Sequence, residues 1–162
     1  MLNYSEIVFR LVVAVLIGCV IGLDRNLHGK PTGIKTLGLV ALGASLTMMA
    51  SLDFSFGHAS FDSGAVGRAI QGVIIGIGFL GAGVITHDRT SERVQGLTTA
   101  ASIGVTAAIG IVCGIGSWQI GGMALVIVLI LFIVGRPLER RLHRQWLSKS
   151  DDEREAIARH EE

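Results

Sequence analysis

The chain has 162 residues, of which 50% are hydrophobic and 17% are charged, and its formal net charge is +1. A soluble domain of this length carries about 25% charged residues, so the composition argues against a soluble domain and favours an integral membrane protein. The net charge by itself says little. Its distribution is more informative, because the charges cluster and leave long stretches with none.

Five apolar runs predict five transmembrane helices, and therefore an all-α polytopic membrane helix bundle. The runs cover residues 7–23, 37–52, 69–85, 97–116 and 118–135. A span needs about 20 residues, so the second run has to use flanking residues or a thinner local bilayer. The first run lacks the basic start and small-residue cleavage site of a signal peptide, so we expect a retained helix. The short turn at Gly116 and Ser117 predicts a hairpin between the last two spans.

The positions of the basic residues predict the orientation. Of the 14 Lys and Arg residues, all but Arg10 and Arg68 fall on one side of a five-span chain. Because basic loops stay in the cytoplasm, we expect the N-terminus outside and the C-terminus inside. This topology puts Cys19 and Cys113 near opposite faces, so we expect no disulfide between them.

The charged C-terminal part differs from the rest in composition. We divide the chain into a transmembrane domain, residues 1–135, and a cytoplasmic tail, residues 136–162. In the tail Leu138, Leu142 and Trp146 recur at helical spacing between basic residues, which is typical of an amphipathic helix on an anionic lipid surface. A simple continuation of the fifth span into solvent is the alternative. Both interpretations stay open.

A glycine-rich stretch at residues 76–83 contains the pattern G-x-G-x-x-G, which binds dinucleotides when it joins a strand to a helix. Here the pattern lies inside an apolar run, and no carboxylate follows at the required distance. We therefore expect close packing of helices around this stretch, at the centre of a tight bundle. The glycines expected to pack are Gly18, Gly22, Gly72, Gly76, Gly78, Gly81, Gly83 and Gly104.

Asp24 and Arg25 end the first span. They fit either an interfacial anchor or a pair pointing into the bundle, where Lys30, Lys35, Arg89 and Arg93 would complete a basic site for lipid phosphate or another anion. Magnesium prefers carboxylates and water, and no dense acidic cluster is present. We therefore expect no metal site and no cofactor.

Two further polar sets lie in the apolar runs. Arg68 and Gln71 share one face of the third span, and could form a network inside the bundle or reach the outer headgroups. Thr98 and Thr99 begin a row of hydroxyl groups on the fourth span, which could bond to helix carbonyls or line a path for an ion. Nothing resembles a nucleophile with a base, so we do not expect an enzyme.

Three blocks of sequence resemble the MgtC/SapB family of bacterial inner-membrane proteins over roughly residues 6–135. The blocks are GLDR followed by GKPTGIKT, at residues 22–25 and 29–36; GIGFLGAGVI, at 76–85; and GLTTAASI, at 96–103. The chain departs from the family pattern at Asp24, Lys35, Gln95 and Gly104. The larger members carry an ACT-like C-terminal domain, which we do not expect here.

The resemblance implies a multi-pass inner-membrane protein with a role in magnesium limitation, virulence, and acid or phosphate stress. Family members are thought to modulate other membrane proteins, including the ATP synthase. We therefore expect an accessory protein that regulates a transporter or ATPase through helix contacts. The alternative is a direct transporter or channel, as a single chain or a homo-oligomer, with a pore along the Thr98–Thr106 face of the fourth span and Arg68. The expected partners are membrane lipids, a membrane transporter or ATPase, and further copies of the chain, but no nucleic acid.

Overall fold

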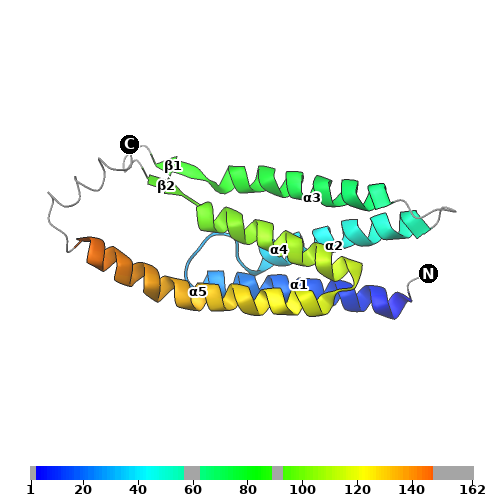
Figure 1. Ribbon diagram of the computed structural model, residues 1–162, viewed down its shortest axis with the longest axis horizontal. Helices are drawn as coiled ribbons and strands as arrows, with labels where there is room; N and C mark the ends of the chain where they lie inside the picture. The colour runs from blue at the N-terminus through cyan, green and yellow to red at the C-terminus, as the bar shows by residue number, and fades with distance from the viewer. Residues whose placement is uncertain (1–2, 57–62, 89–92, 148–162) are drawn as a thin grey trace. The chain divides into compact units, whose positions relative to one another are not determined.

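The computed structural model describes residues 3–56, 63–88 and 93–147 (Figure 1). Within these residues five helices are long and apolar enough to cross a membrane, which confirms the five-span prediction. Between the third and fourth helices lies a short antiparallel hairpin, in which Thr86 pairs with Gln95, and which the sequence did not predict. The elements are α1 Tyr4–Leu27, α2 Ile34–Phe56, α3 Ser63–Val84, β1 Thr86–Asp88, β2 Arg93–Gln95, α4 Leu97–Ile115 and α5 Trp118–Leu147.

Helices α1, α2 and α4 pack against one another and form the core of the bundle (Figure 1). Apolar side chains on a membrane helix gain little by leaving lipid, so this packing depends on close van der Waals fit. The buried apolar side chains combine alanine with larger aliphatic residues, and include Ala14, Ile17, Ile21, Leu37, Ala41, Ala44, Met48, Ile103 and Ala107.

Glycine allows the backbones of these three helices to approach closely. A Cβ atom at Gly18 would lie 2.5 Å from the carbonyl oxygen of Leu37, and one at Gly22 would lie 2.7 Å from the Cα of Ile34. On α4, a Cβ atom at Gly110 would lie 2.5 Å from the carbonyl oxygen of Ala41. Distances this short leave no room for a side chain, so the structure places these glycines where helix backbones meet.

The glycines of α3 have a different environment. A Cβ atom at Gly72, Gly76, Gly78 or Gly83 would meet nothing within 4 Å, whereas one at Gly81 would lie 3.5 Å from the Cβ of Ala100. The expectation that residues 76–83 lie at the centre of a tight bundle is therefore wrong for the single chain.

The physical reason is that α3 makes its internal contacts with valine and isoleucine rather than with glycine. Val66, Ile70, Val73 and Ile77 pack on a core that includes Met48 of α2 together with residues of α4. Gly72 and Gly76 line an open groove beside α2, and Gly78 and Gly83 have open space at their Cβ positions. Gly104 of α4, which was also expected to pack closely, likewise has open space around its Cβ position.

The connection between α4 and α5 consists of Gly116 and Ser117. Gly116 adopts φ 101°, a left-handed conformation that favours glycine, and its N–H donates to the carbonyl of Cys113. A Cβ atom at Gly121 would lie 2.9 Å from the Sγ of Cys113, so the first turns of α5 run back along α4. The predicted hairpin between these helices is therefore present.

The chain divides into two compact units at residues 125 and 126. The second unit begins within α5, which continues through Pro137 to Leu147 as one helix. A helical continuation of the fifth span is one of the two alternatives that the sequence left open for the tail. The charged end at residues 150–162 lies outside the described residues.

Candidate functional site around Arg25

Arg25 lies in the last turn of α1, and only 3% of its surface is exposed. A cation is favoured at the C-terminal end of a helix, where the backbone dipole is negative. A buried guanidinium group is nevertheless unfavourable unless its N–H groups are hydrogen-bonded. The interfacial anchor that the sequence allowed for Arg25 is therefore wrong. The side chain points into the bundle.

Each nitrogen of the Arg25 guanidinium group donates to an oxygen atom. Nη2 lies 2.5 Å from the hydroxyl of Thr99, and Nη1 lies 3.0 Å from the hydroxyl of Ser102, both on α4. Nη2 and Nε donate to the carbonyl of Pro31 at 2.9 and 3.2 Å, and Nε also reaches the hydroxyl of Thr32 at 3.2 Å. The planar fork of arginine is suited to such a set of acceptors. One side chain thus joins α1, the connector and α4.

The connector between α1 and α2 is shaped around this guanidinium group. Thr32 has φ 62°, which is uncommon for a β-branched residue and needs support from its surroundings. Its hydroxyl accepts from Arg25 and donates to the carbonyl of Pro31 at 2.6 Å. Gly33 lies so close to Asn26 that a Cβ atom would collide with the Asn26 side-chain oxygen. The GKPTG sequence therefore forms a tight loop that covers Arg25.

The hydroxyl groups of α4 have partners inside the protein. Ser102 donates to the carbonyl of Thr98 at 2.7 Å, and Thr106 donates to the carbonyl of Ser102 at 2.7 Å. Thr99, Ser102 and Thr106 are buried, whereas the side chain of Thr98 is exposed. These bonds are the ones that the packing interpretation of the hydroxyl row requires.

Of the other predicted members of a basic site, the structure describes the side chains of Lys30 and Lys35. Lys30 and Lys35 are exposed. Asp24 lies beside His28, with 3.7 Å between its Oδ1 and the ring Nδ1. Arg89 and the side chain of Arg93 lie outside the described residues. The structure thus buries Arg25 and leaves the two lysines exposed.

Arg10 makes a second arginine contact with α4 that sequence reasoning missed. Its Nη1 donates to the carbonyl of Gly114 at 3.1 Å, and its Nε lies 2.9 Å from the Glu6 carboxylate. The signal was present in the sequence, because Arg10 and Arg25 are about 22 Å apart along a helix, close to the length of one span. The two arginines of α1 therefore hold opposite ends of α4.

Arg68 and Gln71, on α3, are both exposed in the structure. Neither residue is therefore buried inside the bundle, where the first of the two interpretations placed them. Exposure at the end of the span is consistent with the alternative, in which the long side chain of Arg68 reaches the headgroup region.

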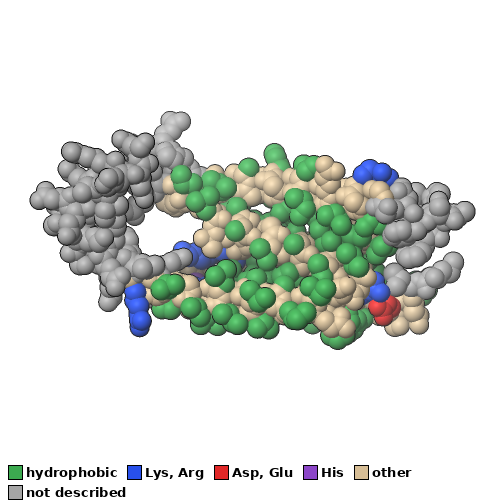
Figure 2. Space-filling model, viewed as in Figure 1, with side chains coloured by type: hydrophobic (Ala, Val, Ile, Leu, Met, Phe, Trp, Pro, Cys, Tyr) green, Lys and Arg blue, Asp and Glu red, His purple; other side chains and the backbone are tan. Residues whose placement is uncertain are grey.

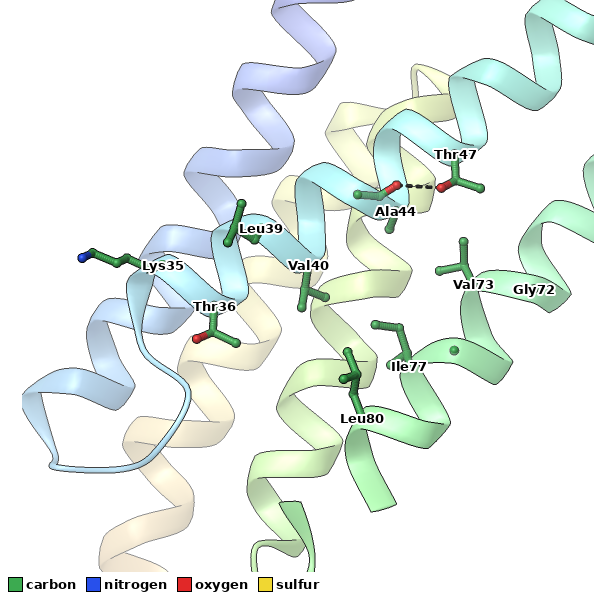
Figure 3. A pocket seen from close by; sticks show the side chains of 12 residues that line it. Lys35, Thr36, Leu39, Val40, Ala44, Thr47, Gly72, Val73, Ile77 and Leu80 are labelled. Atoms are coloured by element: carbon green, nitrogen blue, oxygen red, sulfur yellow. Dashed lines mark hydrogen bonds between the residues drawn. The ribbon is translucent and has the colours of Figure 1, made fainter. Parts of the chain in front are cut away.

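A groove of about 520 Å³ lies between α2 and α3 (Figure 3). In Figure 3 Val73, Ile77 and Leu80 of α3 point toward α2, and Lys35 lies at the N-terminal end of α2 with its ammonium group turned away from them. Figure 2 shows mostly hydrophobic side chains and uncharged atoms along the bundle between its ends. The lining residues are Lys35, Thr36, Leu39, Val40, Gly43, Ala44, Thr47, Gly72, Val73, Gly76, Ile77 and Leu80.

The sequence is similar to several bacterial proteins. Protein SrpB of Synechococcus elongatus is 42% identical over 88% of this chain and 80% of its own length. Protein MgtC of Salmonella typhimurium is 33% identical over 91% of this chain, which spans 60% of that relative. YhiD of Escherichia coli, provisionally named a magnesium transporter, is 36% identical over 85% of this chain and 64% of its own length.

No solved structure matches the chain. The sequence profile of the MgtC family, in contrast, matches residues 11–141, which include most of α1, all of α4, the Arg25 site and most of α5. A match over most of the chain, together with relatives above 30% identity, shows common descent rather than a shared motif. The chain belongs to the MgtC family.

Proposed function

We propose that the protein is a membrane accessory protein that regulates a transporter or ATPase by contact between helices. The observation that carries the proposal is the outward face of α3. On this face Phe79 is 80% exposed and Ile75 is 65% exposed. Gly78, which directly precedes Phe79, has open space at its Cβ position. A large side chain beside a bare backbone is a surface onto which a second membrane helix can pack closely.

Family membership links the protein to magnesium and stress adaptation, because relatives include MgtC and a protein named as a magnesium transporter. Regulation of a partner is favoured over transport by the hydroxyl row of α4. Thr99 and Ser102 accept from a buried arginine, and Ser102 and Thr106 donate to backbone carbonyls. Hydroxyls held in this way are poorly placed to replace the hydration shell of a moving ion.

A photo-crosslinking amino acid at position 79 tests the proposal in living cells. We expect a covalent product with a transporter or ATPase subunit, identified by mass spectrometry. The matched control is position 16 on α1, where Leu16 is 58% exposed in an apolar stretch without the open glycine. Equal products from both positions, or products containing only this chain, would contradict the proposal.

Direct transport is the second candidate, favoured by the provisional name of YhiD. It is tested with the purified protein in liposomes that contain a fluorescent magnesium indicator. The accessory proposal predicts the same influx as in empty liposomes. A protein-dependent, saturable influx would establish the transporter instead.

We also place the protein in the bacterial inner membrane, with its tail in the cytoplasm. The excess of Lys and Arg in the first connector and the tail supports this orientation. Reporter fusions at residues 60 and 150 are expected to lie on opposite sides of the membrane, and finding both on one side would contradict it.

A further inference from the structure

We infer that the groove between α2 and α3 binds one acyl chain of an anionic phospholipid, with the lipid phosphate held near Lys35. The inference is independent of whether the protein regulates a partner or transports an ion. Three observations support this occupant: the length of the groove, its lining, and the charge at one end.

The length of the groove fits a single lipid leaflet. Its α2 wall runs from Lys35 to Thr47. Twelve residues of α-helix rise about 18 Å, close to the roughly 15 Å thickness of the hydrocarbon in half a bilayer. An occupant of these dimensions is a linear chain that begins at one membrane surface and ends near the midplane.

The lining of the groove fits a hydrocarbon chain. Most of its wall residues are apolar, including Val40 on α2 and Val73, Ile77 and Leu80 on α3 (Figure 3). The lining also includes Thr36 and Thr47, and the Thr47 hydroxyl donates to the carbonyl of Gly43. The α3 glycine Gly76 lines the groove and has nothing within 4 Å of its Cβ position, so the space there is deep enough for methylene groups. Packing against such a surface gives many small dispersion contacts, which favour a flexible chain over water.

The charge at one end selects the headgroup. Lys35 lines the end of the groove at the start of α2 and is exposed, so its ammonium group can reach the membrane surface while its stem stays apolar. The same end is the N-terminus of α2, where the helix dipole favours negative charge. An anionic phospholipid whose outer headgroup is neutral has one net negative charge, on its phosphate. In a zwitterionic lipid a cation in the headgroup cancels that charge.

The test uses the full-length protein, stripped of lipid in detergent and titrated with phosphatidylglycerol or phosphatidylcholine of the same chain length. Native mass spectrometry counts the bound lipids. We expect one tightly bound lipid and about a five-fold preference for phosphatidylglycerol, the effect of one lysine near the headgroup. Equal affinity for the two lipids would overturn the inference. So would several bound lipids of similar, weak affinity in place of one tightly bound lipid.

Two pairs of variants locate the site. Lys35→Gln is expected to remove the headgroup preference, whereas Lys30→Gln, an exposed lysine outside the groove lining, keeps it. Gly76→Leu is expected to lower binding of both lipids at least ten-fold by filling the groove, whereas Gly78→Leu, outside the lining, keeps binding. Equal effects within either pair would overturn the inference. A protein dimer that Gly76→Leu dissociates would assign the groove to a second copy instead.

Discussion

Helices α3 and α4 are similar in composition but not in packing. Both are apolar, both carry glycine at repeated positions, and they are joined by the β1–β2 hairpin. Yet 56% of the residues in the α4 span are buried, against 6% in the α3 span. Glycine content alone therefore does not place a helix at the centre of this bundle.

The difference lies in what each glycine faces. On α4, Gly110 and Gly114 sit where the backbone of α2 approaches, and a Cβ atom would come within 2.5 and 2.7 Å of a carbonyl oxygen. On α3, valine and isoleucine make the internal contacts, and Gly76 and Gly78 face open space. Glycine stabilises a membrane bundle only where it lets two backbones meet. Elsewhere it leaves a surface that lipid or another protein can use.

Gly110→Leu should have the largest effect on the stability of the bundle. Its side chain would collide with the backbone of α2 at Ala41, and backbone cannot move aside as a side chain does. Overpacking a core typically destabilises by about 1–3 kcal/mol, and a four-carbon side chain in this gap should exceed that range. We expect loss of the monodisperse peak in detergent size-exclusion chromatography.

Gly104→Leu is the matched control for Gly110→Leu, on the same helix and with the same substitution. A Cβ atom at Gly104 meets nothing within 4 Å. We therefore expect this variant to accumulate and elute like the parent protein. If the two variants behaved alike, the close contact between α2 and α4 would not be what stabilises the core.

Arg25→Leu should have the next largest effect, because it removes the link between α1, the connector and α4. A hydrogen bond to a charged group contributes about 1.5–3 kcal/mol, and the buried hydroxyls of Thr99 and Ser102 would lose their donor. We expect a destabilisation of about 3 kcal/mol or more, measured as the midpoint of thermal unfolding in detergent.

Two other arginine variants sharpen the Arg25 test. Arg25→Lys keeps the charge but loses the fork, and should recover only part of the stability. Arg10→Leu removes a less buried arginine that donates to Glu6 and Gly114, and should be milder than Arg25→Leu. A lysine variant as stable as the parent would show that charge alone is needed at this position.

Much of the fold follows from the sequence, because span length and hydrophobicity are set by the bilayer itself. The five helices, the α4–α5 turn and the membrane assignment are of this kind. Which face of a helix points inward was harder to predict. Small residues recur on several faces of α3, and composition does not tell a face that contacts a neighbour from one that contacts lipid.

The candidate site was predictable only in part. Arg25 was singled out from its position at a helix end, and Thr99 from the hydroxyl row. Their contact was not predicted, because the two are 74 residues apart in sequence and no local pattern connects them. Lys35 was grouped with Arg25 by charge, although the structure buries one and exposes the other. Burial is a property of packing, which a list of charges does not contain.

Gly96→Ala should lower stability less than Arg25→Leu does, because its effect is confined to the point where the β1–β2 hairpin meets α4. Gly96 has φ 92°, and a Cβ atom there would collide with the carbonyl oxygen of Val84. We expect a destabilisation of about 2 kcal/mol, from backbone strain together with the collision, again as a lowered unfolding midpoint. Gly29→Ala, at φ 61° with open space around it, isolates the strain and should lose about 1 kcal/mol. If both variants lost the same stability, the collision with Val84 would not contribute to the effect of Gly96→Ala.

Gly78→Ala should have the smallest effect on stability and the most informative effect on function. Alanine favours a helix over glycine by about 0.5–1 kcal/mol, and its Cβ would meet nothing in this chain. We therefore expect an unchanged or slightly higher unfolding midpoint. If α3 contacts a partner helix at this face, the same methyl group should reduce the crosslink from position 79, since a closely approaching backbone would then meet a side chain. Full crosslinking in this variant would mean that the partner contacts α3 at Phe79 without close approach at Gly78. Lowered stability would mean that this face is already packed within the chain.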